Sequence, residues 1–193
     1  MLAHVQATMV NASKIASGLD ISSPTVSRYI DLMVDLLLVR KLHPWSSNAG
    51  KRLVKSPKIY VRYSGLVHQL LGITNKEALL GNPIIGQSWE GFVIKNILSV
   101  LKQPEQAFFY RTAAGAEIDL LIAFSDQEIW AIEIKRTTAP NVRKGFHNAC
   151  QDIKPQKKFV VYNGEESYSL QNEIKAIGLK SLMTDIINFQ KIR

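Results

Sequence analysis

Two carboxylates and a lysine stand in neighbouring segments that predict β-strands. Asp119 lies in residues 116–124, and Glu133 and Lys135 lie in residues 129–136, with a short polar turn between the segments. Successive strand side chains alternate between faces, so Glu133 and Lys135 project the same way. A hairpin would bring Asp119 beside them. Because charges are costly in an apolar strand unless they are paired or bind a metal, this arrangement predicts a site.

The chemistry that suits these residue types is phosphodiester hydrolysis. Carboxylate oxygens are the ligands that Mg²⁺ prefers, and the ion takes one or two of them from protein. A bound metal would polarise the phosphoryl oxygen and help to form hydroxide. Lys135 would orient or deprotonate the attacking water, or offset charge on the phosphorus. Asp119 and Glu133 are therefore the predicted metal ligands.

Other interpretations of the same residues stay open. Glu133 and Lys135 could form a surface ion pair, which is common and contributes little to stability. Glu117 shares the strand face of Asp119 and competes for its acidic role, while Arg111 could bind phosphate or pair with Glu117. Glu90, in a predicted helix, could be a third metal ligand, could support the other ligands, or could complement the helix dipole.

The composition is that of an ordinary globular chain with a basic bias. It has 193 residues, of which 46% are hydrophobic and 21% charged, and a net charge of +8. A single cysteine, Cys150, excludes an internal disulfide and a cysteine-rich zinc site. No apolar run reaches eighteen residues and no signal-peptide pattern is present, so we expect a cytoplasmic protein without a membrane partner.

The positive charge is concentrated in the first part of the chain. Residues 1–75 contain nine Lys or Arg against three acidic residues, a net charge of +6, which leaves +2 for the remainder. A basic first part suits nucleic acid or another polyanion, although a solvated basic surface would have the same composition.

The first part also has the pattern of a helix-turn-helix. A short helix follows the candidate cap Asn11, and a second helix starts with Ser23 as its cap and Pro24 at its first position. The apolar residues of the second helix that we expect to face a core are Val26, Tyr29, Ile30, Met33, Leu36 and Leu37. The side chains that it would expose towards DNA are Ser22, Thr25, Ser27 and Arg28.

Two predicted strands, 38–42 and 53–61, would complete a winged helix over residues 1–75, with residues 2–10 as its first helix. The basic residues expected on or beside its wing, where they would contact phosphates, are Lys51, Arg52, Lys55 and Lys58. Winged helices also serve as dimer or domain-packing modules, so DNA contact is one of two interpretations.

The second predicted domain covers residues 83–193. Its elements are a helix over 88–101 capped by Ser88, a strand over 107–112, the two strands that carry the candidate site, a helix over 142–153 and a strand over 158–162. A strand at 168–170 and a helix over 180–189 close the chain. The whole chain is thus predicted to be a mixed α/β protein.

Asp119 followed by Glu133-Ile134-Lys135, with Glu90 on a preceding helix, resembles the PD-(D/E)xK nuclease motif. It is most similar to the Holliday-junction resolvase type, although Ile118 stands where that motif usually has proline. The resemblance implies a restriction-endonuclease-like domain, with a central mixed sheet flanked by helices. It also implies a deoxyribonuclease dependent on Mg²⁺ or Mn²⁺, with Glu90 as a third metal ligand.

A second resemblance covers nearly the whole chain. Residues 23–29, 50–60, 89–93 and 110–119 are similar to the C-terminal half of an uncharacterised family of prokaryotic AAA-type ATPases, which consists of a winged helix and a nuclease-like domain. These ATPases carry a P-loop module ahead of this region. The chain contains no Gly-x4-Gly-Lys-Ser/Thr, so we expect it to bind no ATP. It could be a fragment, a truncated gene product or a stand-alone descendant.

Together these observations predict a DNA-binding protein with a metal-dependent nuclease-like domain. The alternative is a non-catalytic module for DNA binding or protein interaction. The implied partners are DNA, with either a second copy of the chain or a separate ATPase.

Overall fold

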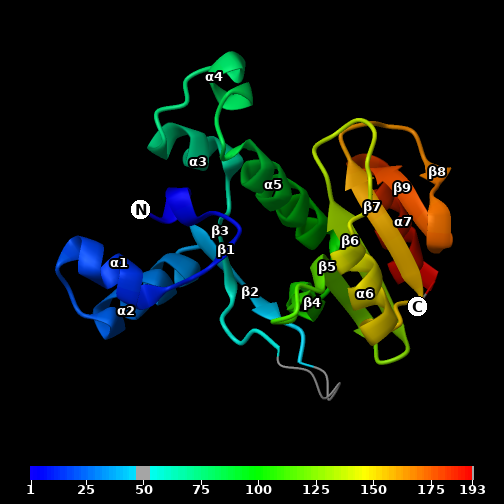
Figure 1. Ribbon diagram of the computed structural model, residues 1–193, viewed down its shortest axis with the longest axis horizontal. Coiled ribbons are helices and arrows are strands. Elements are labelled where there is room, and N and C mark those ends of the chain that lie inside the picture. The colour runs from blue at the N-terminus through cyan, green and yellow to red at the C-terminus, as the bar shows by residue number, and fades with distance from the viewer. Residues whose placement is uncertain (47–52, 193) are drawn as a thin grey trace. The chain divides into compact units, whose positions relative to one another are not determined.

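The computed structural model describes residues 1–46 and 53–192, and it has a mixed α/β fold (Figure 1). The chain forms two compact units. The first combines residues 1–42 with 56–92, and the second combines residues 43–55 with 93–193. The predicted division fell between residues 75 and 83, so the observed first unit extends further along the chain.

The first unit combines several helices with a small antiparallel sheet. Its elements are η1 (Leu2–Val5), β1 (Thr8–Met9), α1 (Ala12–Leu19), α2 (Ser23–Asp35), most of β2 (Val39–Pro44), β3 (Lys58–Val61), α3 (Ser64–Leu70), α4 (Lys76–Leu80) and the first half of α5 (Ile85–Val100). Strand β3 pairs with β1 on one side and with β2 on the other, both antiparallel.

The helix starts of this unit follow from side-chain caps. The Asn11 side chain accepts a hydrogen bond from the Lys14 N–H at 2.9 Å, which confirms the predicted cap of α1. For α2 the cap is Ser22, whose hydroxyl accepts the Thr25 N–H at 3.2 Å, and the prediction of Ser23 is wrong by one residue. The predicted helix over residues 2–10 is also wrong beyond Val5, because Ala7 has a φ of +59° and starts the extended segment of β1.

Two hydrophobic clusters stabilise the first unit. One consists of Ile15, Ala16, Val26, Ile30, Val39 and Ile59, from both helices and the strands. The other consists of Ala3, Val61, Val67, Ile73 and Ile84. The core prediction is correct for the Val26 and Ile30 side of α2. It is wrong for Tyr29, Leu36 and Leu37, which are 57%, 60% and 58% exposed, because the sheet and α1 cover only one side of α2.

The second unit is built on a mixed sheet. Its elements are the end of β2, the second half of α5, η2 (Pro104–Gln106), β4 (Ala107–Arg111), β5 (Glu117–Ser125), β6 (Glu128–Ile134), α6 (Lys144–Ile153), β7 (Lys157–Tyr162), β8 (Tyr168–Ser169), η3 (Gln171–Glu173), β9 (Ile174–Gly178) and α7 (Leu179–Ile192). Strands β4, β5 and β6 are antiparallel, β6, β7 and β9 are parallel, and β8 is antiparallel to β9.

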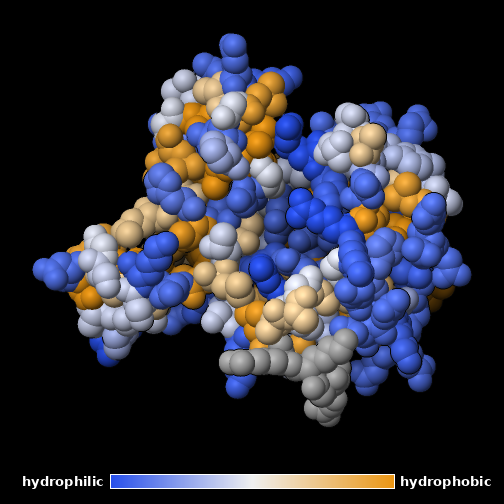
Figure 2. Space-filling model, in the orientation of Figure 1, coloured by the Kyte–Doolittle hydropathy of each residue, from blue (hydrophilic) through white to orange (hydrophobic). Residues whose placement is uncertain are grey.

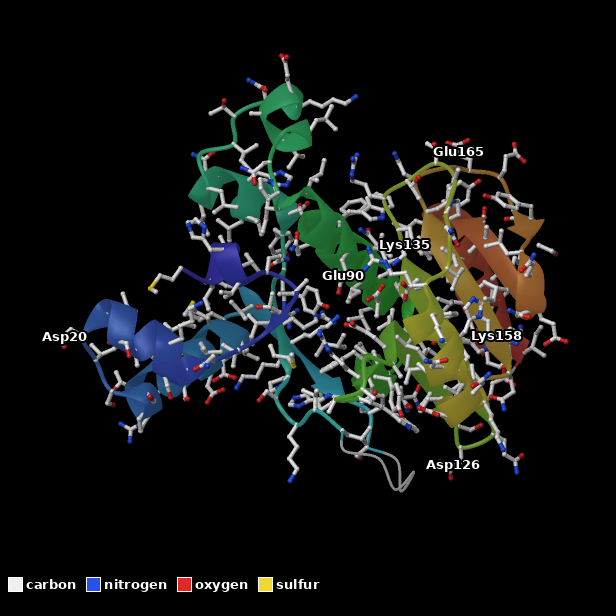
Figure 3. All side chains as sticks on the ribbon, in the orientation of Figure 1. Asp20, Glu90, Asp126, Lys135, Lys158 and Glu165 are labelled. Atoms are coloured by element: carbon white, nitrogen blue, oxygen red, sulfur yellow. The ribbon has the colours of Figure 1, made fainter. Side chains whose placement is uncertain are left out.

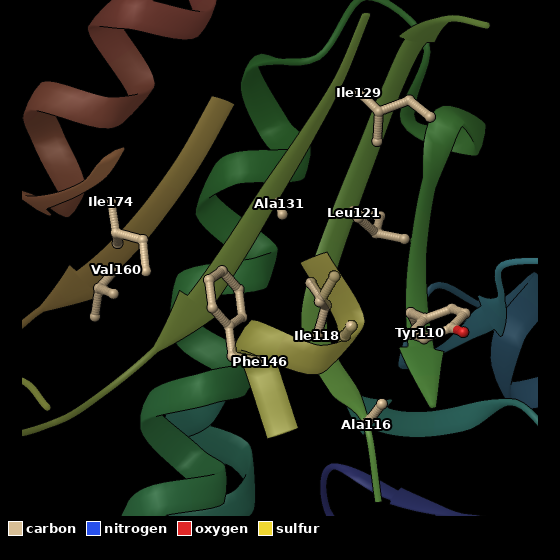
Figure 4. Packing of buried hydrophobic residues seen from close by; sticks show 10 residues of the cluster. Tyr110, Ala116, Ile118, Leu121, Ile129, Ala131, Phe146, Val160 and Ile174 are labelled. Carbon is tan, nitrogen blue, oxygen red and sulfur yellow. The ribbon is translucent and has the colours of Figure 1, made fainter. Parts of the chain in front are cut away.

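Helices cover both faces of this sheet. Phe146 and Ala149 of α6 belong to a buried cluster with Leu121 of β5 and Ala131 of β6 (Figure 4). On the other face, the β6 ring of Trp130 lies 5.1 Å from the α7 ring of Phe189. Strand alternation explains the division, since Ala131 and Trp130 are adjacent and must point to opposite faces.

The predicted order of helix, three strands, helix and strand is the order of α5, β4, β5, β6, α6 and β7. Strand β9 was missed, because Lys175 and Gly178 interrupt its short apolar pattern. Helix α5 starts three residues before the predicted cap Ser88. Ser88 is instead buried, and its hydroxyl lies 2.7 Å from His68 Nε2.

None of the described helices is both long enough and apolar enough to cross a lipid bilayer.

The left-handed backbone conformation of Lys154, at the C-terminal end of α6, can be tested by substitution. Lys154 caps this helix with a φ of 52° and is exposed, and its N–H binds the Cys150 carbonyl at 2.9 Å. Glycine adopts this conformation without steric cost, so Lys154→Gly should raise the free energy of unfolding by up to about 1 kcal/mol in urea denaturation. The exposed helical residue Gln151 is the control, and Gln151→Gly should lower the same quantity by about 1 kcal/mol. If both substitutions changed the free energy of unfolding equally, the left-handed conformation of Lys154 would be contradicted.

Candidate active site

The hairpin of β5 and β6 brings Asp119 beside the segment that carries Glu133. The regular pairing of these strands reaches Leu120 opposite Ile132. Beyond that pair, Asp119 Oδ2 accepts the N–H of Ile134 at 2.9 Å, so a side chain takes the place of a backbone acceptor. The Asp119 carboxylate is thereby held next to the peptide that follows Glu133.

Glu133 is a buried carboxyl group with a cation and an anion as neighbours. Only 5% of the residue is exposed, and its Oε1 accepts a hydrogen bond from the Lys135 ammonium. Burial, and after it the charge of Asp119, raise the pKa of Glu133 to about 8, although Lys135 opposes both effects. The predicted face shared by Glu133 and Lys135 is thus present, and their pair is largely buried rather than a surface ion pair.

A second ion pair lies at the start of β5. Arg111 Nη1 of β4 is 3.5 Å from Glu117 Oε1, and both side chains are partly exposed. The alternative in which Arg111 pairs with Glu117 is therefore the arrangement found. The charge of Glu117 also raises the pKa of Glu133, but its effect is smaller than that of Asp119.

A glycine that the sequence did not single out holds α6 against this hairpin. A Cβ atom on Gly145 would lie 2.7 Å from the Gly115 carbonyl oxygen and 3.8 Å from the Glu117 nitrogen. Only glycine allows this approach without movement. Gly115 itself has a φ of +87° in the turn before β5. The sequence did contain a signal for this close approach, since Gly145 falls within the first turn of the predicted helix 142–153.

The carboxylates fit a hard divalent cation by their chemistry. Within the described parts of the chain, no group of three or more His, Cys, Asp or Glu side chains is placed to hold a metal. Two carboxylates suffice for Mg²⁺, which keeps several waters in most protein sites. Asp119 and Glu133 are therefore the residues that would hold such an ion.

Glu90 lies in the first unit, where it takes part in a polar cluster. Its Oε1 accepts hydrogen bonds from the Tyr60 hydroxyl at 2.6 Å and from the Lys58 ammonium at 3.3 Å. Its role as a third metal ligand stays a prediction. Lys58 is 3% exposed, and this burial does not support the phosphate contact predicted for it.

The other residues predicted to contact DNA occupy varied positions. Thr25 is partly buried, and its hydroxyl lies 2.8 Å from that of Ser22. Ser27 and Arg28 are exposed on α2, and Lys55 is exposed in the second unit. Lys51 and Arg52 lie outside the described residues. DNA contact by these side chains stays a prediction.

The fold and site define a mixed α/β protein in which a sheet hairpin carries two adjacent carboxylates and a lysine. Residues 85–182 match the family described as Domain of unknown function (DUF4143), and residues 1–77 match the Domain of unknown function (DUF8612). The first match covers just over half of the chain, which therefore belongs to the DUF4143 family. This family is often found at the C-terminus of AAA-ATPase-like proteins.

Two curated relatives, one from Mycobacterium tuberculosis and one from Mycobacterium bovis, carry the description of uncharacterized protein. Each is 38% identical to this chain over 184 residues, which cover 95% of this chain and 41% of the relative. The chain thus spans about two-fifths of the length of these relatives. No solved structure matches it significantly.

The raised pKa of Glu133 predicts a pH-dependent effect of Glu133→Gln. Below about pH 4.5 this carboxyl is protonated in both the folded and unfolded states and contributes no pH dependence. Between that pH and about 8 the unfolded chain releases the proton more readily, so the stability of the folded state falls as pH rises. In a chelating buffer, Glu133→Gln should therefore raise the melting temperature at pH 8 more than at pH 5.

The matched control is Asp126→Asn in the exposed turn between β5 and β6, which should shift the melting temperature alike at both pH values. A Glu133→Gln protein that is destabilised at pH 8 relative to pH 5 would show that Lys135 outweighs burial.

Proposed function

We propose that the second unit is a PD-(D/E)xK nuclease-like domain that hydrolyses phosphodiester bonds in DNA with a divalent metal. The observation that carries this proposal is the meeting of Asp119, Glu133 and Lys135 at the open end of one hairpin. The order of elements from α5 to β7 also supports it, because it is the order of the common core of that superfamily.

Asp119 and Glu133 would hold the metal, Mg²⁺ or Mn²⁺. Such an ion polarises a phosphoryl oxygen and lowers the pKa of water. Asp119 is already oriented by the Ile134 N–H, so its second oxygen is directed by a fixed backbone. The Lys135 ammonium, held by Glu133, would offset negative charge that develops on the phosphate.

Basic residues after β6 favour a polyanionic substrate. Arg136, Arg143 and Lys144 are exposed and lie in or at the end of the segment that joins β6 to α6. This segment follows directly on Glu133 and Lys135, and positive side chains there suit contacts with phosphates on either side of a scissile bond.

For the first unit we propose the winged-helix fold, supported by the succession of α1, α2 and the antiparallel strands β2 and β3. In the longer relatives this unit and the nuclease-like unit would follow an ATPase-like module. The activity of the longer relatives would then combine DNA processing with the activity of their ATPase-like module.

Cleavage assays with matched variants test the nuclease proposal. The wild-type chain should cleave linear or branched DNA with Mg²⁺ or Mn²⁺ and lose this activity in chelator. Asp119→Asn, Glu133→Gln and Lys135→Met should each lower the rate by about a hundredfold or more. Asp126→Asn, at the far end of the hairpin from Lys135, should leave the rate unchanged (Figure 3).

Metal binding separates the nuclease from the non-catalytic alternative. Calorimetric titration of Mn²⁺ should show one site that Asp119→Asn and Glu133→Gln weaken and that Lys135→Met retains. If the wild-type chain neither binds metal nor cleaves any form of DNA, the nuclease proposal is wrong. The module would then act by binding alone, with DNA affinity that falls steeply with salt and ignores these substitutions.

A further inference from the structure

The exposed side of α2 carries an apolar stripe, which we define as Tyr29, Leu32 and Leu36. These side chains are 57%, 51% and 60% exposed, and their spacing of three and four residues places them on one side of a helix. Isolated exposed apolar residues are common, whereas an aligned set of this size marks an interaction surface. Figure 2 shows hydrophobic residues at the surface of the first unit.

The apolar surface continues at both ends of this stripe. Tyr29 also lines a cavity of about 470 Å³ together with Ile30 and Met33 of α2 and residues of η1 and α1. At the other end, Leu37 is 58% exposed in the left-handed region, with a φ of +59°. A bulky residue rarely adopts this conformation, and glycine is usual at such a helix end. An apolar side chain is thus kept on the surface despite a conformational cost, as at many functional surfaces.

The charges of α2 argue against a nucleic-acid surface here. Between Ser23 and Asp35 the helix contains one basic residue, Arg28, and two acidic residues, Asp31 and Asp35. Phosphate contacts dominate DNA affinity, and a helix without an excess of basic side chains offers few of them. The stripe therefore suits a protein surface better than the DNA groove.

The charges beside the stripe also indicate which protein would bind it. Arg28 and Asp35 are exposed and seven residues apart, which is two helical turns, so they border the stripe on the same side and lie about 10 Å apart along the axis. The midpoint between them falls just before Leu32, and the midpoint between Tyr29 and Leu36 falls just after it, each within about 1 Å of Leu32 along the helix axis. The stripe and its charges are therefore both centred close to Leu32.

We propose that this face pairs α2 with α2 of a second copy of the chain in an antiparallel arrangement centred on Leu32. A twofold axis near that residue brings Tyr29 within about one residue rise, 1.5 Å along the axis, of the partner's Leu36, and brings Arg28 equally near the partner's Asp35. Both ion pairs form at once, because the twofold axis keeps the two charged residues on the same side of the contact. Two apolar stripes are removed from water with complementary charges at their border.

Sedimentation equilibrium of the full chain tests the pairing by charge reversal. The wild type should show a monomer–dimer equilibrium, and Arg28→Asp should raise its dissociation constant about tenfold, because it faces an acid on the partner. Asp35→Arg should have the same effect. The double variant Arg28→Asp with Asp35→Arg should restore the wild-type constant, since the exchanged charges pair again.

A second pair of variants removes the apolar contact. Leu32→Glu should give a monomer at concentrations where the wild type is dimeric. Leu80→Glu, at a residue of α4 with the same 51% exposure, should leave the dimer intact. Circular dichroism checks that both variants are folded.

A wild-type chain that stays monomeric at high concentration would overturn the proposal. The stripe would then be assigned to contact with another segment of the longer relatives. A dimer that the double variant does not restore would overturn the antiparallel geometry. DNA affinity that Leu32→Glu lowers while the chain remains monomeric would assign the face to nucleic acid instead.

Discussion

The burial of Glu133 beside Asp119 is the constraint on which the second unit depends. Two carboxylates close together in a mostly apolar sheet are unfavourable, and the structure offsets this with a lysine ammonium on one and a backbone N–H on the other. Strands β5 and β6 end their regular pairing at this point, and Gly145 lets α6 approach the turn before β5. A bound cation would relieve the repulsion between the two carboxylates, in keeping with the proposed metal site.

The sequence predicted this hairpin well because its strands have strong local signals. Ile, Leu and aromatic residues alternate around a polar turn, and the i, i+2 spacing of Glu133 and Lys135 fixes their common face. The cap at Asn11 was predictable for the same reason, since a single local hydrogen bond determines it. The hydrogen bond from Ile134 to Asp119 has no such signal, because it depends on where two strands stop pairing.

The errors came from features that depend on distant neighbours. Apolar spacing identified Tyr29 and Leu36 as core residues, yet nothing in a helical pattern says how many sides of the helix the rest of the chain covers. Lys58 looked like a surface cation of a basic segment, and its burial against Glu90 depends on a residue 32 positions later. Strand β9 is short and interrupted, and its parallel pairing with β7 provides the support that its own sequence lacks.

The Asp119 side chain has two parts to play, one in the hydrogen bonding of the sheet and one in the charge of the candidate site. The Asp119 carboxylate accepts a sheet N–H through one oxygen, and its negative charge also acts on Glu133. An asparagine oxygen accepts the same bond, so evolution can remove the anion without disturbing the strands. If the proposed nuclease function holds, a single substitution would remove activity and leave the fold intact, so the two carboxylates of the hairpin, rather than the fold, would distinguish an active member of the family from an inactive one.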